Sequence, residues 1–361
     1  MKHANSTLPI ASSDNVLRNI AAELRRHAHQ RPERFAVRFL GDGENVTASL
    51  TYAELDRRAT ALAANLLAQG AYGERALLLY PNGIDYVVAF FACLYSGVVA
   101  VPAYPPESLH PQHLTRLRSI AQDAQAAFIL TDSAHRAQMM EWQAGTPAVS
   151  GAVVLATDVI SQEASADDLP GLRHDGLAFL QYTSGSTSQP KGVKVTHRNL
   201  MANTEAMWGS MGLSANDVTV SWLPLYHDMG LIGGMLQPIR WGGTLVLMTP
   251  SHFMEKPRRW LMAISAFKGS HSGGPDFAYR LCEERTSAAA MADLDLSSWR
   301  VAFCGSEPIR AQTMEAFGIK FSAAGFDPRA LYCCYGLAEA TLLIAGNLPM
   351  TGVITVKADI G

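Results

Sequence analysis

Strand-like and helix-like segments alternate along most of this 361-residue chain. Short apolar runs such as residues 76–80 and 301–304 fit buried strands, and the amphipathic run at residues 15–29 fits a helix. Such alternation is typical of α/β proteins, in which mostly parallel sheets are covered by helices. The length suffices for a large core and more than one subdomain. We therefore expect an α/β fold.

Local signals fix two stretches of this pattern. Thr51 and Glu54 have the spacing of a capping box, so a helix should begin there and continue to about Gln69. Residues 86–103 contain no charge, which is long enough for a membrane helix. Gly97 interrupts this run and suits a helix C-cap, and the following valines suit a buried parallel strand. We expect a helix and a strand of the core, and no transmembrane segment.

Charge and cysteine content exclude several classes of protein. The 29 basic and 32 acidic residues are nearly balanced and no basic face is apparent, which disfavours nucleic-acid binding. The five cysteines lack metal-ligand spacing and predict buried thiols in a reducing compartment. The first fourteen residues carry no apolar signal core, so a cytoplasmic location is expected.

A loop rich in hydroxyl groups, residues 182–192, follows the apolar run at residues 177–180, and a helix-like segment opens near Thr196. Backbone N–H groups, hydroxyls and a lysine in one loop are how proteins usually hold phosphates. The Walker pattern fails, because Pro190 precedes Lys191 and Gly192 follows it. A serine-rich surface turn is the plainer alternative. The density of hydrogen-bond donors beside a strand favours a nucleotide phosphate site.

The loop resembles that of the acyl-adenylate-forming ligases, which reads Tyr-Thr-Ser-Gly-Ser-Thr-x-x-Pro-Lys-Gly, and the match continues to His197. Ser188 stands where many members carry Gly. The resemblance implies an AMP-binding N-terminal domain over residues 1–361, with two packed subdomains at approximately 1–170 and 171–361. It also implies ATP and Mg²⁺ as cofactors, and Lys191 as a catalytic residue. The implied phosphate-binding residues are Thr183, Ser184, Gly185, Ser186, Thr187 and Lys191.

A second motif, residues 222–230, follows another predicted strand, and ligands in α/β sheets bind beyond such strand ends. His227 could face the nucleotide or the acyl carboxylate, or could simply be held by Asp228. The family carries a His or an aromatic residue here, beside the substrate tunnel. The resemblance thus assigns catalysis to His227 and an acyl path to its neighbours, although ordinary core packing explains each of these singly. The implied substrate residues are Trp222, His227, Met229, Gly230 and Ile232.

The third motif begins at Gly305, after the predicted strand 301–304. Gly305 allows close backbone approach, and Pro308 suits the first turn of a helix, here expected at residues 308–317. Glu307 could instead only favour the helix dipole. In the family the matching Gly-x-Glu-Pro segment packs against adenine. The resemblance therefore assigns Gly305, Ser306, Glu307 and Pro308 to cofactor binding.

The fourth motif, Tyr335-Gly336-Leu337-Ala338-Glu339, follows the predicted strand 331–334. Tyr335 could stack on a base, and Glu339 could coordinate Mg²⁺ on phosphates, or be an exposed acid early in a helix. The family's Tyr-Gly-x-x-Glu supplies these two roles. The implied cofactor-binding residues are Tyr335, Gly336, Leu337 and Ala338, with Glu339 as the metal ligand.

Further details resemble the fatty acyl-AMP ligase branch, namely residues 102–106, 272–279 and 335–342. That branch activates a fatty acid as acyl-AMP and passes it to an acyl carrier protein or a carrier domain of a polyketide or peptide synthase. An acyl-CoA ligase fragment and a non-catalytic binding module are the alternatives.

The family's ribose-binding aspartate, its hinge and its small C-terminal domain with a catalytic lysine have no counterpart in these 361 residues. A lysine that neutralises developing charge contributes several kcal/mol to catalysis. The isolated chain is therefore expected to adenylate poorly.

Overall fold

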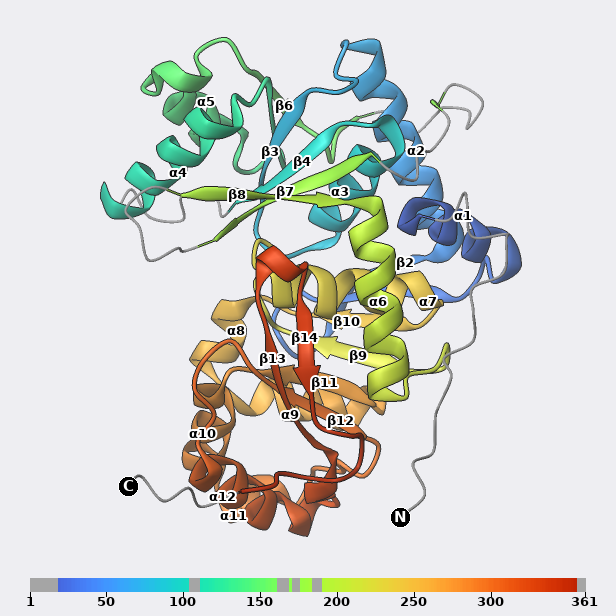
Figure 1. Cartoon of the computed structure of the whole chain (residues 1–361), viewed down its shortest axis with the longest axis vertical. Helices are drawn as coiled ribbons and strands as arrows, with labels where there is room; N and C mark the ends of the chain where they lie inside the picture. Colours follow the sequence, from blue (N-terminus) through green and yellow to red (C-terminus); the bar gives the residue numbers. More distant parts are fainter. Residues whose placement is uncertain (1–18, 104–110, 161–168, 171–175, 184–189, 356–361) are drawn as a thin grey trace, which may run out of the picture.

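Two β-sheets, each covered by helices, form the two lobes of the molecule in a computed structural model (Figure 1). The structure describes residues 19–103, 111–160, 169–170, 176–183 and 190–355. The expected α/β architecture of mostly parallel sheets covered by helices is confirmed. Among the described strands, β1–β2, β7–β8 and β13–β14 pair antiparallel and the other neighbours pair parallel.

The six-stranded lobe has the strand order β6-β5-β3-β4-β7-β8. Its strands are β3 (Arg75–Leu79), β4 (Val99–Ala103), β5 (Phe128–Thr131), β6 (Val153–Ala156), β7 (Leu177–Thr183) and β8 (Lys191–Thr196). The eight-stranded lobe has the order β14-β13-β12-β11-β9-β10-β1-β2. Its strands are β1 (Phe35–Leu40), β2 (Val46–Thr51), β9 (Val218–Ser221), β10 (Thr244–Leu247), β11 (His271–Gly274), β12 (Val301–Cys304), β13 (Leu331–Gly336) and β14 (Leu343–Gly346).

The helices begin and end largely where capping chemistry predicts. The expected capping box of Thr51 and Glu54 is present, and Gly97 closes its helix in the left-handed conformation. The α-helices are α1 (Ile20–Gln30), α2 (Tyr52–Ala68), α3 (Ile84–Ser96), α4 (Pro111–Ala124), α5 (Arg136–Ala144), α6 (His197–Met211), α7 (Gln237–Trp241), α8 (Pro250–Glu255), α9 (Arg258–Phe267), α10 (Asp276–Arg285), α11 (Ala288–Met291) and α12 (Ala311–Phe321). A π-helix, η4 (Met229–Leu236), continues directly into α7.

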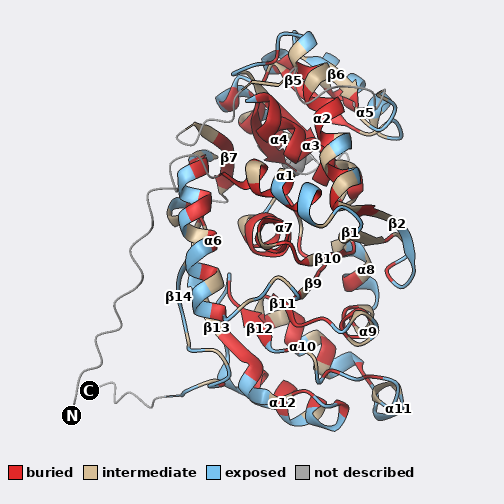
Figure 2. Cartoon of the chain, turned by 90° about the vertical axis from the view of Figure 1, so that its right-hand side faces the viewer, coloured by how far each residue is buried: buried red, intermediate tan, exposed pale blue. Residues whose placement is uncertain are grey.

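Alternate residues of the six-stranded sheet enter two separate cores. Leu78 belongs to the large core with α1, α2 and α3, whereas Leu77 and Leu79 belong to a smaller core with α4 and α5. This follows from the two-residue period of a strand buried on both faces. The residues of η4 and most of those of α7 are buried, and Figure 2 shows α7 at the centre of the molecule.

The two sheets do not divide the chain at residue 170. Strands β1 and β2 come early in the sequence yet join the eight-stranded sheet, because β1 pairs with β10. The β7–β8 hairpin comes after residue 170 yet completes the six-stranded sheet. Each lobe is therefore assembled from segments that are distant in the sequence.

Several elements differ from the sequence-based expectation. The amphipathic run at 15–29 becomes a helix only from Ile20, because Asn19 is its N-cap, and residues 15–18 lie outside the described part. The hydroxyl-rich loop connects two antiparallel strands rather than a strand and a helix, since β8 precedes α6. The predicted strand 331–334 extends to Gly336, so Tyr335 lies within β13.

No helix in the described part of the chain combines the length and apolar character needed to cross a membrane. Residues 86–103 instead form most of α3 and the whole of β4, as expected.

Hydrogen bonds from the six-stranded lobe hold the loop after β9. The Asn82 amide donates to the carbonyl oxygens of Leu223 (2.8 Å) and Met248 (3.3 Å), and its oxygen accepts the Leu225 N–H (3.0 Å). Tyr86 donates to the Leu225 carbonyl oxygen at 2.7 Å. Because Asn82 is buried, water cannot take its place as the hydrogen-bond partner of these backbone groups.

We expect Asn82→Ala to lower the free energy of unfolding by about 2–3 kcal/mol, since it leaves several buried polar groups without partners. Urea denaturation followed by tryptophan fluorescence measures the loss. The exposed Asn216 provides the matched control, and Asn216→Ala should change the free energy by less than about 0.5 kcal/mol. Equal stability of the two variants would contradict the bridging role of Asn82.

Candidate functional site

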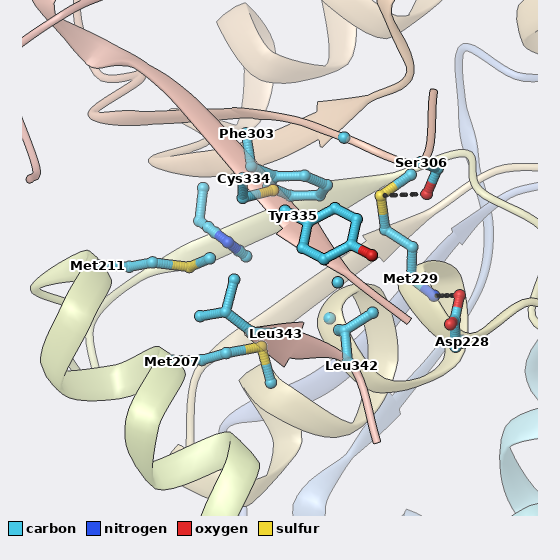
Figure 3. Close-up of a pocket in the computed structure, with 14 residues that line it drawn as sticks. Met207, Met211, Asp228, Met229, Phe303, Ser306, Cys334, Tyr335, Leu342 and Leu343 are labelled. Atoms are coloured by element: carbon cyan, nitrogen blue, oxygen red, sulfur yellow. Dashed lines mark hydrogen bonds between the residues drawn. The ribbon is translucent and has the colours of Figure 1, made fainter. Parts of the chain in front are cut away.

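A cavity opens to solvent where β12 and β13 end, and it is bordered by α6, η4 and β14. Such strand ends are where α/β sheets bind ligands. Figure 3 shows its side chains converging from these elements. The cavity contains a polar part, with residues from the third and fourth motifs, and an apolar part.

The polar part consists of Gly305, Ser306, Tyr335 and Gly336, which all line the cavity. Tyr335 is 62% exposed, so one face of an aromatic ring is open to a ligand. A Cβ on Gly305 would lie 3.0 Å from the Cys334 carbonyl oxygen, so glycine permits the close approach of β12 and β13. Ser306 has a backbone φ of +68°, and this left-handed conformation is strained for any residue other than glycine.

The apolar part combines side chains from three elements. Met207 and Met211 extend from α6 towards Leu342 and Leu343 at the start of β14 (Figure 3). Met229 of η4 reaches the polar part, where the Ser306 hydroxyl donates to its sulfur at 3.4 Å. Methionine side chains are flexible and polarisable, so this wall can adapt to an apolar ligand. The polar and apolar parts thus share one cavity.

His271 adds an ionisable group to this wall. It is 2% exposed, and its Nδ1 lies 3.2 Å from the Thr219 hydroxyl. Burial lowers the pKa of His271 to about 4, Asp217 opposes this change, and Arg300 adds to it. The imidazole is therefore neutral at pH 7. Its Nε2 is buried and makes no hydrogen bond within the described part of the chain.

Most residues of the second motif lie around the cavity without lining it. Met229 lines it, whereas Trp222 stacks on Phe253 at 3.8 Å in the core and Ile232 is fully buried in η4. A Cβ on Gly230 would lie 2.3 Å from the Pro224 carbonyl oxygen, so glycine lets η4 pack against the preceding loop. In this geometry Trp222, Gly230 and Ile232 lie behind the cavity wall, and their substrate role stays a prediction.

His227 projects outward from the same loop, with its side chain 57% exposed. Its Nδ1–H donates to Asp228 at 3.1 Å, the arrangement considered above as the plainer alternative. Asp228 also accepts the Met229 N–H at 2.7 Å, which caps η4. Among the described residues, Asp228 and Met229 line the cavity and His227 does not.

The third motif lies before the helix in irregular backbone, and the helix expected at 308–317 begins three residues later than predicted and ends at Phe321. Helix α12 begins at Ala311, because the buried Asp276 carboxylate accepts the Arg310 N–H at 2.8 Å and the Thr313 hydroxyl at 3.1 Å. Pro308 therefore precedes the helix. Glu307 accepts the Phe277 N–H at 2.7 Å, so it stabilises the start of α10.

The predicted phosphate loop joins β7 to β8 in the sequence, and Thr183 pairs with Lys191 at the facing ends of these strands. Ser184, Gly185, Ser186 and Thr187 lie outside the described residues. A Cβ on Gly192 would approach the Tyr182 ring within 2.9 Å, and the Tyr182 hydroxyl donates to Asp123 at 2.6 Å. Gln181 donates to the Tyr226 carbonyl oxygen at 2.9 Å, which ties the hairpin to the loop of His227.

Glu339 lies on a short turn, Ala338–Ala340, just beyond β13, and it is exposed. Leu337 and the buried Ala338 connect it to the polar part of the cavity. Within the described residues, no group of three His, Cys, Asp or Glu side chains could hold a metal ion. A single accessible carboxylate still fits Mg²⁺, which commonly takes one or two carboxylates together with substrate phosphates.

Comparison with known proteins identifies the family. Residues 24–360 match the family described as AMP-binding enzyme. The chain belongs to the AMP-binding enzyme family. This match, together with the relatives described next, confirms the expected resemblance to the acyl-adenylate-forming ligases and to their fatty acyl-AMP ligase branch.

Two curated relatives and one solved structure illustrate the similarity. The medium-chain-fatty-acid–[acyl-carrier-protein] ligase JamA of Moorena producens is 43% identical over 89% of this chain and 55% of its own length. The long-chain-fatty-acid–AMP ligase FadD26 of Mycobacterium marinum is 36% identical over 95% of the chain and 60% of its own length. A fatty acyl-adenylate ligase from L. pneumophila, in complex with acyl adenylate and pyrophosphate, is 38% identical with a TM-score of 0.84, covering 92% of this chain and 58% of its own. The chain thus spans little more than half of these relatives.

Sequence reasoning missed three residues that shape the site. Asn82 and Asp276 position loops through buried hydrogen bonds, and His271 lines the cavity. Asp276 falls within the branch segment 272–279, which was the available signal for it and for the strand β11 beside it. Asn82 lies in a Pro-Asn-Gly turn sequence and His271 lies between two serines, and neither pattern indicates a role at the site.

We expect His271 to make stability pH-dependent in one window. The pKa of His271 is about 4 in the folded chain and about 6.5 in the unfolded chain. Between these two pH values the unfolded chain binds a proton on this histidine and the folded chain does not. The free energy of unfolding should therefore fall as the pH drops from about 6.5 to about 4, by roughly 3 kcal/mol from this residue. Denaturation curves at pH 7 and pH 4.5 measure the fall.

His271→Gln should show a smaller decrease over the same pH interval. His27, whose pKa burial also lowers, contributes equally to both proteins and cancels in the comparison. His135→Gln, at a half-exposed position, is the control and should behave as the unaltered chain. An unchanged decrease in His271→Gln would refute the assignment.

Proposed function

We propose that the protein of which these residues form part activates a fatty acid with ATP to form acyl-AMP. The observation that carries the proposal is the single cavity in which an exposed aromatic ring and close-packed glycines adjoin a methionine-rich apolar wall. An acyl-adenylate has this same division, with a polar nucleotide joined to an apolar chain. The acyl-adenylate and pyrophosphate bound to the related L. pneumophila ligase support the proposal.

The proposed roles follow the two parts of the cavity. Tyr335 stacks on adenine, and the backbone from Gly305 to Pro308 borders the base. The hairpin with Thr183 and Lys191 binds the β- and γ-phosphates, and Glu339 would hold the Mg²⁺ that offsets their charge. Met229 and the residues of α6 and β14 hold the acyl chain.

His227 positions the reacting carboxylate in this proposal. Its exposed side chain lies on the loop that Gln181 ties to the phosphate hairpin, so a carboxylate between the two could reach it. The reaction joins that carboxylate to the α-phosphate of ATP and releases pyrophosphate. The protein contributes mainly positioning and charge stabilisation.

The acceptor of the acyl group is proposed to be a carrier protein, as the name of JamA states for that relative. Coenzyme A is the alternative acceptor. To distinguish the two acceptors, a carrier protein and coenzyme A are presented together to the preformed acyl-adenylate, and the thiol that receives the acyl group is identified.

The five cysteines of the chain itself are free thiols, which agrees with the reducing conditions of the cytoplasm.

We expect a non-hydrolysable decanoyl-adenylate analogue to bind the 361-residue chain at least tenfold more tightly than AMP, because it fills both parts of the cavity. Isothermal titration calorimetry measures both affinities. Tyr335→Ala should weaken both ligands by about tenfold, in line with the contribution of base stacking. Leu343→Trp should fill the apolar part and remove the advantage of the decanoyl group while AMP binding persists.

Equal affinity of the chain for AMP and the decanoyl analogue would refute the acyl-adenylate proposal. Ile319→Trp is the control for the added bulk of Leu343→Trp, because Ile319 is 71% exposed on α12 and does not line the cavity. That variant should retain the full preference for the decanoyl analogue.

Glu339 is expected to couple Mg²⁺ to ATP binding. Mg²⁺ should strengthen ATP binding to the unaltered chain, and Glu339→Gln should reduce this gain by about tenfold, since the neutral amide is a poorer ligand for a hard cation. Titrations of ATP with and without Mg²⁺ provide the comparison. The exposed Glu315 supplies the control, because Glu315→Gln removes the same charge away from the cavity. An identical Mg²⁺ gain in both variants would remove Glu339 from the metal site.

A further inference from the structure

The apolar part of the cavity contains one polar side chain whose presence packing does not explain. His271 lies between Thr219 of β9 and Phe303 of β12, with its ring 5.1 Å from the Phe303 ring. Both His271 and Phe303 line the cavity. An apolar side chain could fill this position and would need no hydrogen-bond partner. The buried, unpaired Nε2 of His271 instead destabilises the folded state by about 1–3 kcal/mol.

Strand register places His271 at the deep end of the cavity. His271 pairs with Val301, at the start of β12, while Gly305 follows the end of that strand. Four residues of strand separate these two levels, which corresponds to roughly 13 Å. The cavity therefore extends from the polar part, at the carboxyl edge of the sheet, along the strands to His271. Any acyl chain attached to a nucleotide at Tyr335 would run towards this side chain.

A glycine allows the Phe303 ring to lie beside His271. A Cβ on Gly273, which pairs with Phe303, would lie 2.4 Å from the Phe303 ring. The absence of a side chain at Gly273 lets the Phe303 ring lie across β11 and next to His271. The histidine is thus held on one side by an aromatic ring and on the other by the Thr219 hydroxyl, and only Nε2 remains without a partner.

The chemistry of the site restricts what can satisfy Nε2. The imidazole is neutral at pH 7, because burial lowers its pKa to about 4. Arg300, the cation that acts on His271, is already paired with Asp217 at 2.5 Å. A carboxylate at the end of the ligand would therefore bring a buried charge without a free compensating cation, which is costly. An uncharged oxygen carries no such cost. A hydroxyl group suits either tautomer of His271, since it can both donate and accept, whereas a keto oxygen suits only the tautomer with a proton on Nε2.

We propose that His271 selects fatty acids that carry an uncharged oxygen substituent, above all a hydroxyl group, on the part of the chain that reaches the deep end of the cavity. This inference rests on the proposed acyl-adenylate function and names its substrate class. His271 acts as a specificity-determining residue, because its hydrogen bond is made only with the substituted chain. Sites built to hydrogen-bond a substrate oxygen discriminate strongly against analogues that lack it.

The test is a set of non-hydrolysable acyl-adenylate analogues of one chain length, in which a hydroxyl group is moved one carbon at a time along the chain. Isothermal titration calorimetry with the 361-residue chain gives each affinity relative to the unsubstituted analogue. We expect one position, or two adjacent positions, to bind at least tenfold more tightly than the unsubstituted analogue. A keto analogue at the preferred position then identifies the tautomer of His271.

Two variants distinguish the effect of the His271 hydrogen bond on affinity from the effect of the cavity's shape. His271→Phe keeps an aromatic ring and should abolish the hydroxyl preference while the unsubstituted analogue still binds. Met211→Leu alters the apolar wall without a polar group and should retain the preference. Thermal unfolding of each variant without ligand shows whether it is folded, and the series on the unaltered chain stands independently of both variants.

The outcomes distinguish this inference from the proposed function. If the unsubstituted and all hydroxylated analogues bind with equal affinity, water rather than substrate satisfies Nε2, and the inference is overturned while the acyl-adenylate function stands. If none of the analogues binds better than AMP, the proposed function itself fails. A hydroxyl preference that persists in His271→Phe would also overturn the inference.

Discussion

The hydrogen bonds of Asn82 are the constraint on which the site geometry depends. A single buried amide of the six-stranded lobe fixes backbone groups at Leu223, Leu225 and Met248 of the eight-stranded lobe. The loop between β9 and η4 therefore has a defined position relative to both sheets. Gln181 then links the same loop to the hairpin that carries Lys191. The proposed phosphate and acyl regions keep their separation because both are tied to one loop.

Features with local physical causes could be predicted from the sequence. The capping box at Thr51 and the left-handed cap at Gly97 depend only on nearby residues, and both are present. The hairpin partner β8 was missed, because antiparallel pairing is a relation between two segments and the hydroxyl-rich loop obscured it. The start of α12 was misplaced for a similar reason. The side chain that keeps Arg310 out of the helix, Asp276, is 34 residues away.

At the site, too, residues with a local sequence signal could be predicted and residues that depend on distant segments could not. Gly305 and Tyr335 were found because each follows or ends an apolar strand and carries a recognisable motif, and both line the cavity. His227 also fulfils a motif, but its side chain projects outward in this structure. His271 carries no local signal, since a single histidine among the serines and glycines of residues 269–274 matches no site motif. Only the pairing of β11 with β9 and β12 shows that this residue borders the cavity.

The parallel pairing of β11, β12 and β13 explains how one cavity can hold two chemically different halves of a ligand. Parallel strands end at the same edge, so the residues after them, such as Gly305, gather polar backbone groups at the opening. Residues earlier in the same strands, such as Phe303, are buried and apolar because helices cover both faces of the sheet. A ligand that enters from the edge therefore passes from polar to apolar surroundings. The neutral His271 at the far end interrupts this gradient, and in our proposal its unpaired Nε2 selects the group at the end of the bound chain.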